Sequence, residues 1–318
     1  MLSRVAERMY WFGRYVERIE NTARLINVNT NLVLDLPKVK FIWASLISIT
    51  GYEDRFFSRF TIQDEKNVIK FLLDGESCSI MTSVRMAREN ARTTREIMPN
   101  EAWEKINKLY LYLEKNIHKG IRREGRHQLL KDVMESCQEL TGYLSGCMSL
   151  DESYNFMKIG SNLERADMTT RILDVGCLNL LNPEHPEIRE YETILWMNVL
   201  QSLTAYQMYR QHVDDRINGE DVADFLLGDE KFPRAVAHCL SDVNESFTLL
   251  PNHDEPLRSV TRAQRVISNC DVAELLASDD LHMFIDDIQA DLAHIHNQLN
   301  STWFDYQSDV PQGTSVVP

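Results

Sequence analysis

The sequence predicts an all-α protein, a multi-helix bundle with two pseudo-repeated helical halves. Apolar residues recur at three- and four-residue steps through most of the chain, and they never alternate with polar residues for long enough to indicate a strand. One polar motif occurs twice, as GRYVERIENTARLINV at 13–28 and as GSNLERADMTTRILDV at 160–175. We therefore expect a single helical domain over 1–304, with halves near 1–147 and 148–304.

Glycine and proline residues divide the first half into separate helices. Asp35-Leu36-Pro37, Gly51, Gly75 and Pro99 each follow an apolar segment of helical spacing, where they end a helix. Two further helices are expected to form an antiparallel hairpin around Gly120. The expected helices of this half are 2–34, 38–50, 63–73, 77–98, 101–119 and 124–148.

The second half begins with the helix that carries the second copy of the motif. Asp151 caps this helix, and Asn182-Pro183 ends it. The expected helices of this half are 152–181, 188–213, 219–227, 233–249, 255–277 and 280–304. The polar segment 305–318 is expected to be a disordered tail.

The overall charge and hydropathy exclude several classes of protein. The chain of 318 residues has 34 basic and 48 acidic residues, and its net charge of −14 disfavours a surface for nucleic acid or an anionic membrane. No segment approaches the ~20 apolar residues of a membrane span, and the N-terminus lacks the apolar core of a signal peptide. We expect a soluble, cytoplasmic protein whose six cysteines, none in a C-x-x-C pair, are small buried hydrophobes.

The duplicated motif places acids and an arginine on one face of each helix. Glu17, Glu20 and Arg24 follow i, i+3, i+7 spacing, which brings them to one narrow face. The second copy repeats this pattern with Glu164, Asp167 and Arg171. Gly13 and Gly160 lie one turn earlier on the same faces. A glycine placed twice beside the same carboxylate indicates that room is needed there, for a close helix crossing or for a ligand.

A third charged segment, SVRMARENARTTREIM at 83–98, adds further candidates for a binding site. Its arginines are spaced at three- and four-residue steps and could present an array of donors to a phosphate or a carboxylate. Glu89-Asn90-Ala91-Arg92 partly echoes the motif. We therefore add Arg88, Glu89 and Arg92 to the candidate ligand-binding residues.

These charges have a structural and a functional interpretation. The pairs Glu20–Arg24 and Asp167–Arg171 have the favourable i,i+4 orientation, and such pairs are common on solvated helix faces. The helix that carries Glu17 is apolar around much of its circumference, so its charges must be paired inside the protein. Such a network either serves packing alone or forms a ligand-binding or catalytic site.

A more specific alternative to these interpretations is a carboxylate metal centre, built from the four acids of the two motifs. Ferritin-like centres of this kind also use two E-x-x-H motifs, and the sequence has one, Glu124-x-x-His127. Arg24 and Arg171 would repel a cation. We therefore expect no metal, and the absence of a glycine-rich nucleotide loop predicts no cofactor.

Four segments give the chain a resemblance to a known family. LSRVAERMYWFGRYVERIENTARL at 2–25, SVRMARENART at 83–93, LERADMTTRILDV at 163–175 and DVADFLLGDEKFPRAVAHCL at 221–240 resemble the alpha-E family, a bacterial all-helical domain family of unknown function. Family members are encoded beside, or fused to, a circularly permuted ATP-grasp ligase, and a transglutaminase-like protein often accompanies them. The resemblance implies these two partners and a role in making or modifying a peptide-like amide.

The leading hypothesis is therefore an accessory or substrate-handling subunit of an ATP-grasp peptide or amide ligase system. It binds a small amino-acid or peptide-like ligand, with the arginines of the motifs and of 83–98 taking the anion and the motif acids taking the amine. A stand-alone enzyme that uses paired carboxylates as acid and base, and a carboxylate metalloprotein, are the alternatives.

Overall fold

The computed structural model describes residues 3–36, 41–76, 78–180, 190–213 and 216–304, and these residues form helices and no strand. The all-α prediction is confirmed. The helices are α1 (Ser3–Asp35), α2 (Ile42–Thr50), α3 (Glu53–Phe57), α4 (Glu65–Asp74), α5 (Ile80–Thr93), α6 (Asn100–Ile121), α7 (Arg123–Cys147), α8 (Glu152–Leu180), α9 (Glu192–Ser202), α10 (Tyr206–His212), α11 (Gly219–Gly228), α12 (Val236–Thr248), α13 (Asp254–Ser268), α14 (Val272–Ala277), α15 (Leu281–Leu299) and a π-helical turn η2 (Asn300–Phe304).

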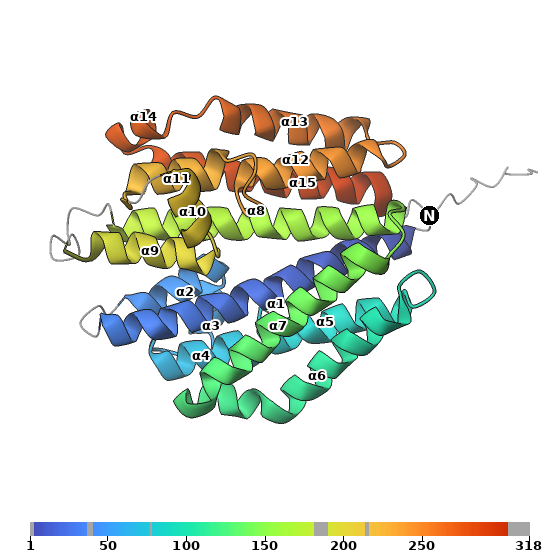
Figure 1. The fold of residues 1–318 in the computed structure, drawn as a ribbon, viewed down its shortest axis with the longest axis horizontal. Helices are drawn as coiled ribbons and strands as arrows, with labels where there is room; N and C mark the ends of the chain where they lie inside the picture. Colours follow the sequence, from blue (N-terminus) through green and yellow to red (C-terminus); the bar gives the residue numbers. More distant parts are fainter. Residues whose placement is uncertain (1–2, 37–40, 77, 181–189, 214–215, 305–318) are drawn as a thin grey trace, which may run out of the picture.

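The two motif helices, α1 and α8, lie at the centre of the molecule (Figure 1). Helices α4 to α7 lie on the α1 side, and α11 to α15 lie on the α8 side. Because α1 is covered by α5, α7 and α8, it is buried around most of its circumference, including the charged residues Glu17, Glu20 and Arg24.

Helices α1 and α8 cross at the two glycines of the motif. A Cβ on Gly13 would lie 2.2 Å from the carbonyl oxygen of Met157, and a Cβ on Gly160 would lie 2.1 Å from that of Tyr10. No other residue fits at either position without moving a backbone. The room that the duplicated glycines indicated is thus used for a close helix crossing. The equivalence of the two halves beyond these two helices stays a prediction.

The expected single helix over 188–213 is wrong, because α9 and α10 are separate helices in the described part of this segment. Thr204 has a φ of 54°, and the N–H of Ala205 donates to the carbonyl of Leu200 at 2.7 Å, which closes the end of α9. The change of direction buries both Trp196 and Tyr209. Periodicity cannot show this break, since both helices are apolar on their inner faces.

The expected helix over 255–277 is also divided, into α13 and α14. Asp271, which periodicity placed inside a helix, instead accepts a hydrogen bond from the N–H of Glu274 and caps α14. Helix α5 ends at Thr93 rather than near Met98, and the hydroxyl of Thr94 donates to the carbonyl of Asn90. The short helix α3 was not expected, and the predicted tail over 305–318 lies outside the described residues.

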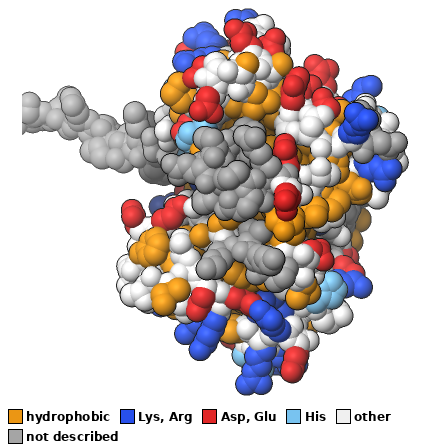
Figure 2. All heavy atoms as spheres, turned by 90° about the vertical axis from the view of Figure 1, so that its left-hand side faces the viewer, with side chains coloured by type: hydrophobic (Ala, Val, Ile, Leu, Met, Phe, Trp, Pro, Cys, Tyr) orange, Lys and Arg blue, Asp and Glu red, His pale blue; other side chains and the backbone are white. Residues whose placement is uncertain are grey.

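The surface carries charges of both signs. On the face at the left of Figure 1, acidic and basic side chains are interspersed around exposed hydrophobic ones (Figure 2). Among the helices of the described ranges, none combines the length and the apolar character needed to cross a bilayer.

Candidate functional site

The two Glu-Arg dipeptides of the motif exchange partners across the α1–α8 crossing. Arg165 of α8 donates to Glu17 of α1 at 2.9 Å. In the reciprocal contact, Arg18 of α1 donates to both oxygens of Glu164 of α8, at 2.5 and 2.9 Å. Neighbouring residues on a helix point about 100° apart. The glutamate and the arginine of each dipeptide therefore reach different groups on the opposite helix.

Glu164 is buried and takes both of its partners from α1. Besides Arg18, the Nε of Arg14 donates to it at 2.7 Å. Burial alone would raise the pKa of Glu164, but the two guanidinium groups outweigh burial and lower it to about 2. Arg14 also donates to the hydroxyl of Tyr10, which lies 2.8 Å from Nδ1 of His296 on α15. This end of the crossing is thus tied to the C-terminal helix.

At the other end of the α1–α8 crossing, Glu17 accepts a hydrogen bond from a residue outside the two helices. Arg234, which precedes α12, donates to Glu17 at 2.8 Å and to the side-chain oxygen of Asn21 at 2.8 Å. Burial raises the pKa of Glu17, and Arg234 and Arg165 together lower it to about 2. Glu20 is held by Arg24, by Gln138 of α7 and by Arg234. We call this group the Glu17 cluster: Glu17, Glu20, Arg24, Arg165 and Arg234.

The Glu17 cluster has more hydrogen-bond donors than acceptors. It combines three guanidinium groups with two carboxylates. Within the described residues, the buried Nε atoms of Arg24 and Arg165 and the Nδ2 of Asn21 have no acceptor. Excess positive charge and unpaired N–H groups disfavour a cation here. The acids of the first motif are therefore poor metal ligands.

The Glu164 end, in contrast, borders a cavity of about 330 Å³, which we call the Glu164 cavity. Its wall combines three arginines, two acids and several smaller polar side chains. It is lined by Arg14, Arg18, Thr22, Ile49, Thr50, Gly51, Tyr52, Cys78, Glu164, Asp167, Met168 and Arg171. Both acids of the second copy, Glu164 and Asp167, thus border this open volume. The acids of the first copy, Glu17 and Glu20, are not among its lining residues.

Arg171 and Asp167 are the accessible charges of the Glu164 cavity. Nε of Arg171 donates to Oδ1 of Asp167 at 3.0 Å, and the Arg171 side chain is 31% exposed. Its terminal nitrogens make no hydrogen bond to the described residues, and Nη1 lies 2.7 Å from where a Cβ on Gly51 would be. Gly51 has a φ of 68° and its N–H donates to the carbonyl of Ser48, so the chain leaves α2 in a tight turn close to the guanidinium group.

Comparison with known proteins identifies the family. A family model described as a predicted alpha-helical domain with a conserved ER motif matches residues 1–304. The chain belongs to the Alpha-E family. The Glu-Arg dipeptides that exchange partners at the α1–α8 crossing are sequences of the type that this description names.

The similar curated proteins are mycobacterial and uncharacterized. One from Mycobacterium bovis and two from Mycobacterium tuberculosis are each 24% identical to this Alpha-E chain over 329 aligned residues, which cover 93% of it. The match covers 35% of each relative, so the chain spans about a third of the length of these proteins. No solved structure matches the chain.

The remaining candidates of this Alpha-E chain lie outside the Glu164 cavity. Glu89 and Arg92 form an exposed pair on α5, with nitrogen–oxygen distances of 2.6 and 2.8 Å. Arg88 donates to Asn107 of α6 at 2.8 Å, and its guanidinium group lies over the ring of Tyr110. The structure thus brings together the acids and arginines of the two motifs but directs Arg88 toward α6. A ligand-binding role for the α5 residues stays a prediction.

The thiol in the Glu164 cavity is not a reactive nucleophile. Burial raises the pKa of Cys78 to about 11, which outweighs the nearby positive charge of Arg18. The thiol is therefore protonated at neutral pH, and the thiolate is the nucleophilic form. The prediction that all six cysteines are buried is confirmed for four of them, Cys78, Cys137, Cys177 and Cys239. It is wrong for Cys147, which is exposed, and for Cys270, which is partly exposed.

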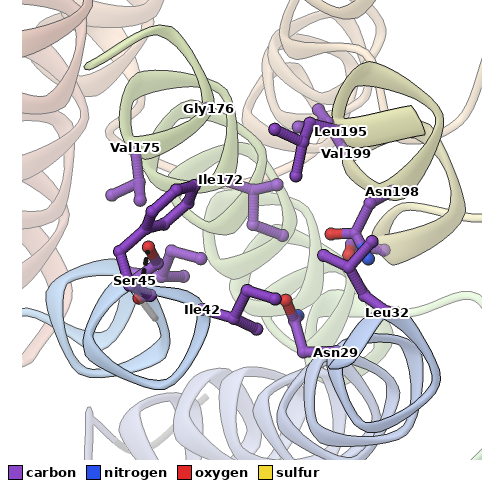
Figure 3. Close-up of a pocket in the computed structure, with 13 residues that line it drawn as sticks. Asn29, Leu32, Ile42, Ser45, Ile172, Val175, Gly176, Leu195, Asn198 and Val199 are labelled. Carbon is purple, nitrogen blue, oxygen red and sulfur yellow. Dashed lines mark hydrogen bonds between the residues drawn. The ribbon is translucent and has the colours of Figure 1, made fainter. Parts of the chain in front are cut away.

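A second, smaller pocket lies between α1, α2, α8 and α9 (Figure 3). Its volume of about 50 Å³ leaves room for little more than ordered water. Apolar side chains such as Ile42, Ile172 and Leu195 form most of the wall, with Asn29 and Asn198 among the polar groups. Of these two, the Glu164 cavity is the better candidate for a ligand because it is larger and carries charge.

Sequence reasoning did not select Arg14, Arg18, Arg165 or Arg234 as site residues. The signal for Arg18 and Arg165 was the dipeptide itself, since an arginine that follows a glutamate cannot share its helix face. Arg234 had no comparable signal, because it lies 217 residues from Glu17 in the chain.

Proposed function

We propose that this chain is a substrate-handling domain of an ATP-grasp peptide or amide ligase system, and that its Glu164 cavity binds a small amino-acid or peptide-like ligand. The observation that carries the proposal is the pair Arg171 and Asp167. They place an available cation and an available anion side by side in the wall of one cavity.

The charges of the cavity favour a ligand that has both a carboxylate and an ammonium group. Arg14 and Arg18 already donate to Glu164, whereas the terminal nitrogens of Arg171 make no hydrogen bond to the described residues, so Arg171 supplies the guanidinium that can bind a new anionic partner. A planar guanidinium binds a carboxylate through two parallel hydrogen bonds. Oδ2 of Asp167 has no hydrogen-bond donor among the described residues and can accept from an ammonium group.

The size of the cavity supports a small ligand. Its volume of about 330 Å³ lies at the lower end of the ~300–1,000 Å³ range of small-molecule sites. Tyr52 and Met168 add apolar surface beside the charges, which suits the side chain of an amino acid or a short peptide.

The proposed partners are a circularly permuted ATP-grasp ligase and a transglutaminase-like protein, as the family resemblance implies. About two thirds of each mycobacterial relative lies outside the region that matches this chain, so further domains can share a chain with this one. The ATP chemistry would belong to the ligase, and we place the system in the cytoplasm, where ATP is available.

The carboxylates at the crossing fit binding better than acid–base catalysis. Both Glu17 and Glu164 have pKa values lowered to about 2 by buried arginines, and an efficient general acid or base has a pKa near the working pH. Their oxygens also already accept hydrogen bonds from arginine. These properties support a rigid scaffold beside the cavity.

Calorimetry with a panel of amino acids and dipeptides tests the proposal, together with co-purification of the ligase. Arg171→Ala should weaken the binding of any ligand found at least tenfold, because it removes the charge-assisted hydrogen bonds to the ligand carboxylate. Arg92→Ala is the matched control, since Arg92 also pairs with an acid on its own helix but lies on α5. Absence of binding to the whole panel, together with no complex with the ligase, would refute the proposal.

A further inference from the structure

A histidine lies between two carboxylates at the start of α15, away from the charges of the Glu17 cluster. Nδ1 of His282 is 2.5 Å from Oδ1 of Asp174 on α8, and its Nε2 is 3.6 Å from Oδ2 of Asp286, one turn later on α15. Asp174 is buried, and Asp286 is 58% exposed. These three residues bring one potential ligand atom each to within 4.8 Å of the others.

The contact with Asp174 determines which ring nitrogen of His282 can bind a metal ion. A carboxylate accepts the hydrogen bond, so the neutral ring carries its proton on Nδ1 and has its lone pair on Nε2. Metal-binding histidines are commonly oriented in this way, with the nitrogen that does not bind the metal donating to a carboxylate. The free lone pair is thus on the side of the ring that faces Asp286.

The spacing between Nε2 and Asp286 suits a shared ion. Zinc binds nitrogen at ~2.0–2.1 Å and carboxylate oxygen at ~2.0–2.2 Å, and a tetrahedral angle then separates the two ligand atoms by about 3.4 Å. The observed separation is 3.6 Å. We infer that His282 and Asp286 form a site for a zinc-like divalent transition-metal ion, oriented by Asp174. Water completes the coordination shell, so the ion is exchangeable.

A second histidine–aspartate pair in the same protein shows what distinguishes this site. His238 and Asp242 have the same i,i+4 spacing and a separation of 3.8 Å, and Nδ1 of His238 is 2.7 Å from the carbonyl oxygen of Glu230. Asp242, however, already pairs with the ammonium group of Lys158 at 3.2 Å. Among the described residues, Asp286 has no cationic partner except His282.

Calorimetric titration of the full, tag-free chain with zinc chloride tests the inference. We expect one ion per chain, and at least tenfold weaker binding in both His282→Ala and Asp286→Asn. Asp174→Asn should weaken binding by ~10–100-fold, the usual effect of removing a carboxylate that orients a ligand. Because Asp174 is not itself a ligand, the absorption spectrum of bound Co²⁺ should keep its shape in that variant.

His238→Ala is the matched control and should bind zinc as the unmodified chain does. Asp286 is exposed, so thermal melts should show that Asp286→Asn remains folded. The inference is overturned if the unmodified chain takes up no zinc, if His282→Ala binds as tightly as the unmodified chain, or if His238→Ala loses the same affinity.

Discussion

The two ends of the α1–α8 crossing carry the same motif but have different surroundings. At the Glu17 end, Arg234 and Gln138 from two other segments close over the acids. At the Glu164 end, the partners Arg14 and Arg18 come from α1 alone, and the next turn of α8 faces the Glu164 cavity. The acids of the duplicated motif thus form a buried cluster at the Glu17 end and part of a cavity wall at the Glu164 end. The difference comes from residues outside the motif.

Removing a carboxylate should have the largest effect on the free energy of unfolding, and the size of that effect should differ between the two ends of the crossing. Glu17→Gln leaves Arg165 without a charged partner and leaves Arg234 with Glu20 alone, and breaking a buried ion pair typically costs about 3–5 kcal/mol of the free energy of unfolding. Glu164→Gln should cost less, because its arginines border a cavity that water can enter. Urea denaturation measures both, with Glu89→Gln on the exposed face of α5 as a control that should stay within ~0.5 kcal/mol. Equal losses at the two ends would contradict the comparison.

Lowering the pH should gradually remove the stabilisation that the carboxylates of Glu17 and Glu164 provide. The pKa values of Glu17 and Glu164 are lowered to about 2 in the folded chain from an ordinary value of 4.5, so each ionised carboxylate stabilises the fold above pH 4.5. This stability should be lost as the pH falls from about 4.5 to about 2. The free energy of unfolding, measured across this range, should depend less steeply on pH in Glu17→Gln. An unchanged slope in that variant would show that Glu17 does not titrate with folding.

Substituting the crossing glycines should act on both ends together. Gly13→Ala and Gly160→Ala place a methyl group about 2 Å from a backbone oxygen of the opposite helix. We expect each to lower the free energy of unfolding by about 1–3 kcal/mol or more. Gly142→Ala in α7 is the control, since nothing lies within 4 Å of its Cβ position. That variant should instead be stabilised by ~0.5–1 kcal/mol. Higher melting temperatures in the two crossing variants would show that the helices are farther apart than described.

The smallest effect on stability is expected at the accessible end. Arg171→Ala breaks a partly exposed i,i+4 pair, and such pairs contribute about 0.3–0.5 kcal/mol. Its repeat equivalent, Arg24→Ala, should cost more, because it leaves Glu20 buried with fewer donors. Thermal melts of the two variants measure this contrast. A larger loss in Arg171→Ala would assign that residue a structural role instead of a binding role.

The sequence predicted the helices well where apolar periodicity was long and the ends carried glycine or proline, as for α1 and α8. It failed at Thr204 and at Asp271, where a tight turn interrupts two apolar segments that are both buried. For the site, spacing along one helix correctly grouped Glu17, Glu20 and Arg24. It could not show which acid faces a cavity, because that depends on Arg234 and on α2, which contacts α8.

The partners of α1 also set the order in which the molecule can be completed. Glu164 is 146 residues from Arg18 in the chain, Arg234 is 217 residues from Glu17, and His296 is 286 residues from Tyr10. At synthesis rates of ~5–20 residues per second, Tyr10 precedes its partner by roughly 15–60 s. During that interval Tyr10 has no histidine partner, and for most of it Glu17 has no contact with Arg234. Helix α1 therefore reaches its final environment only after the C-terminal helix α15 has been synthesised.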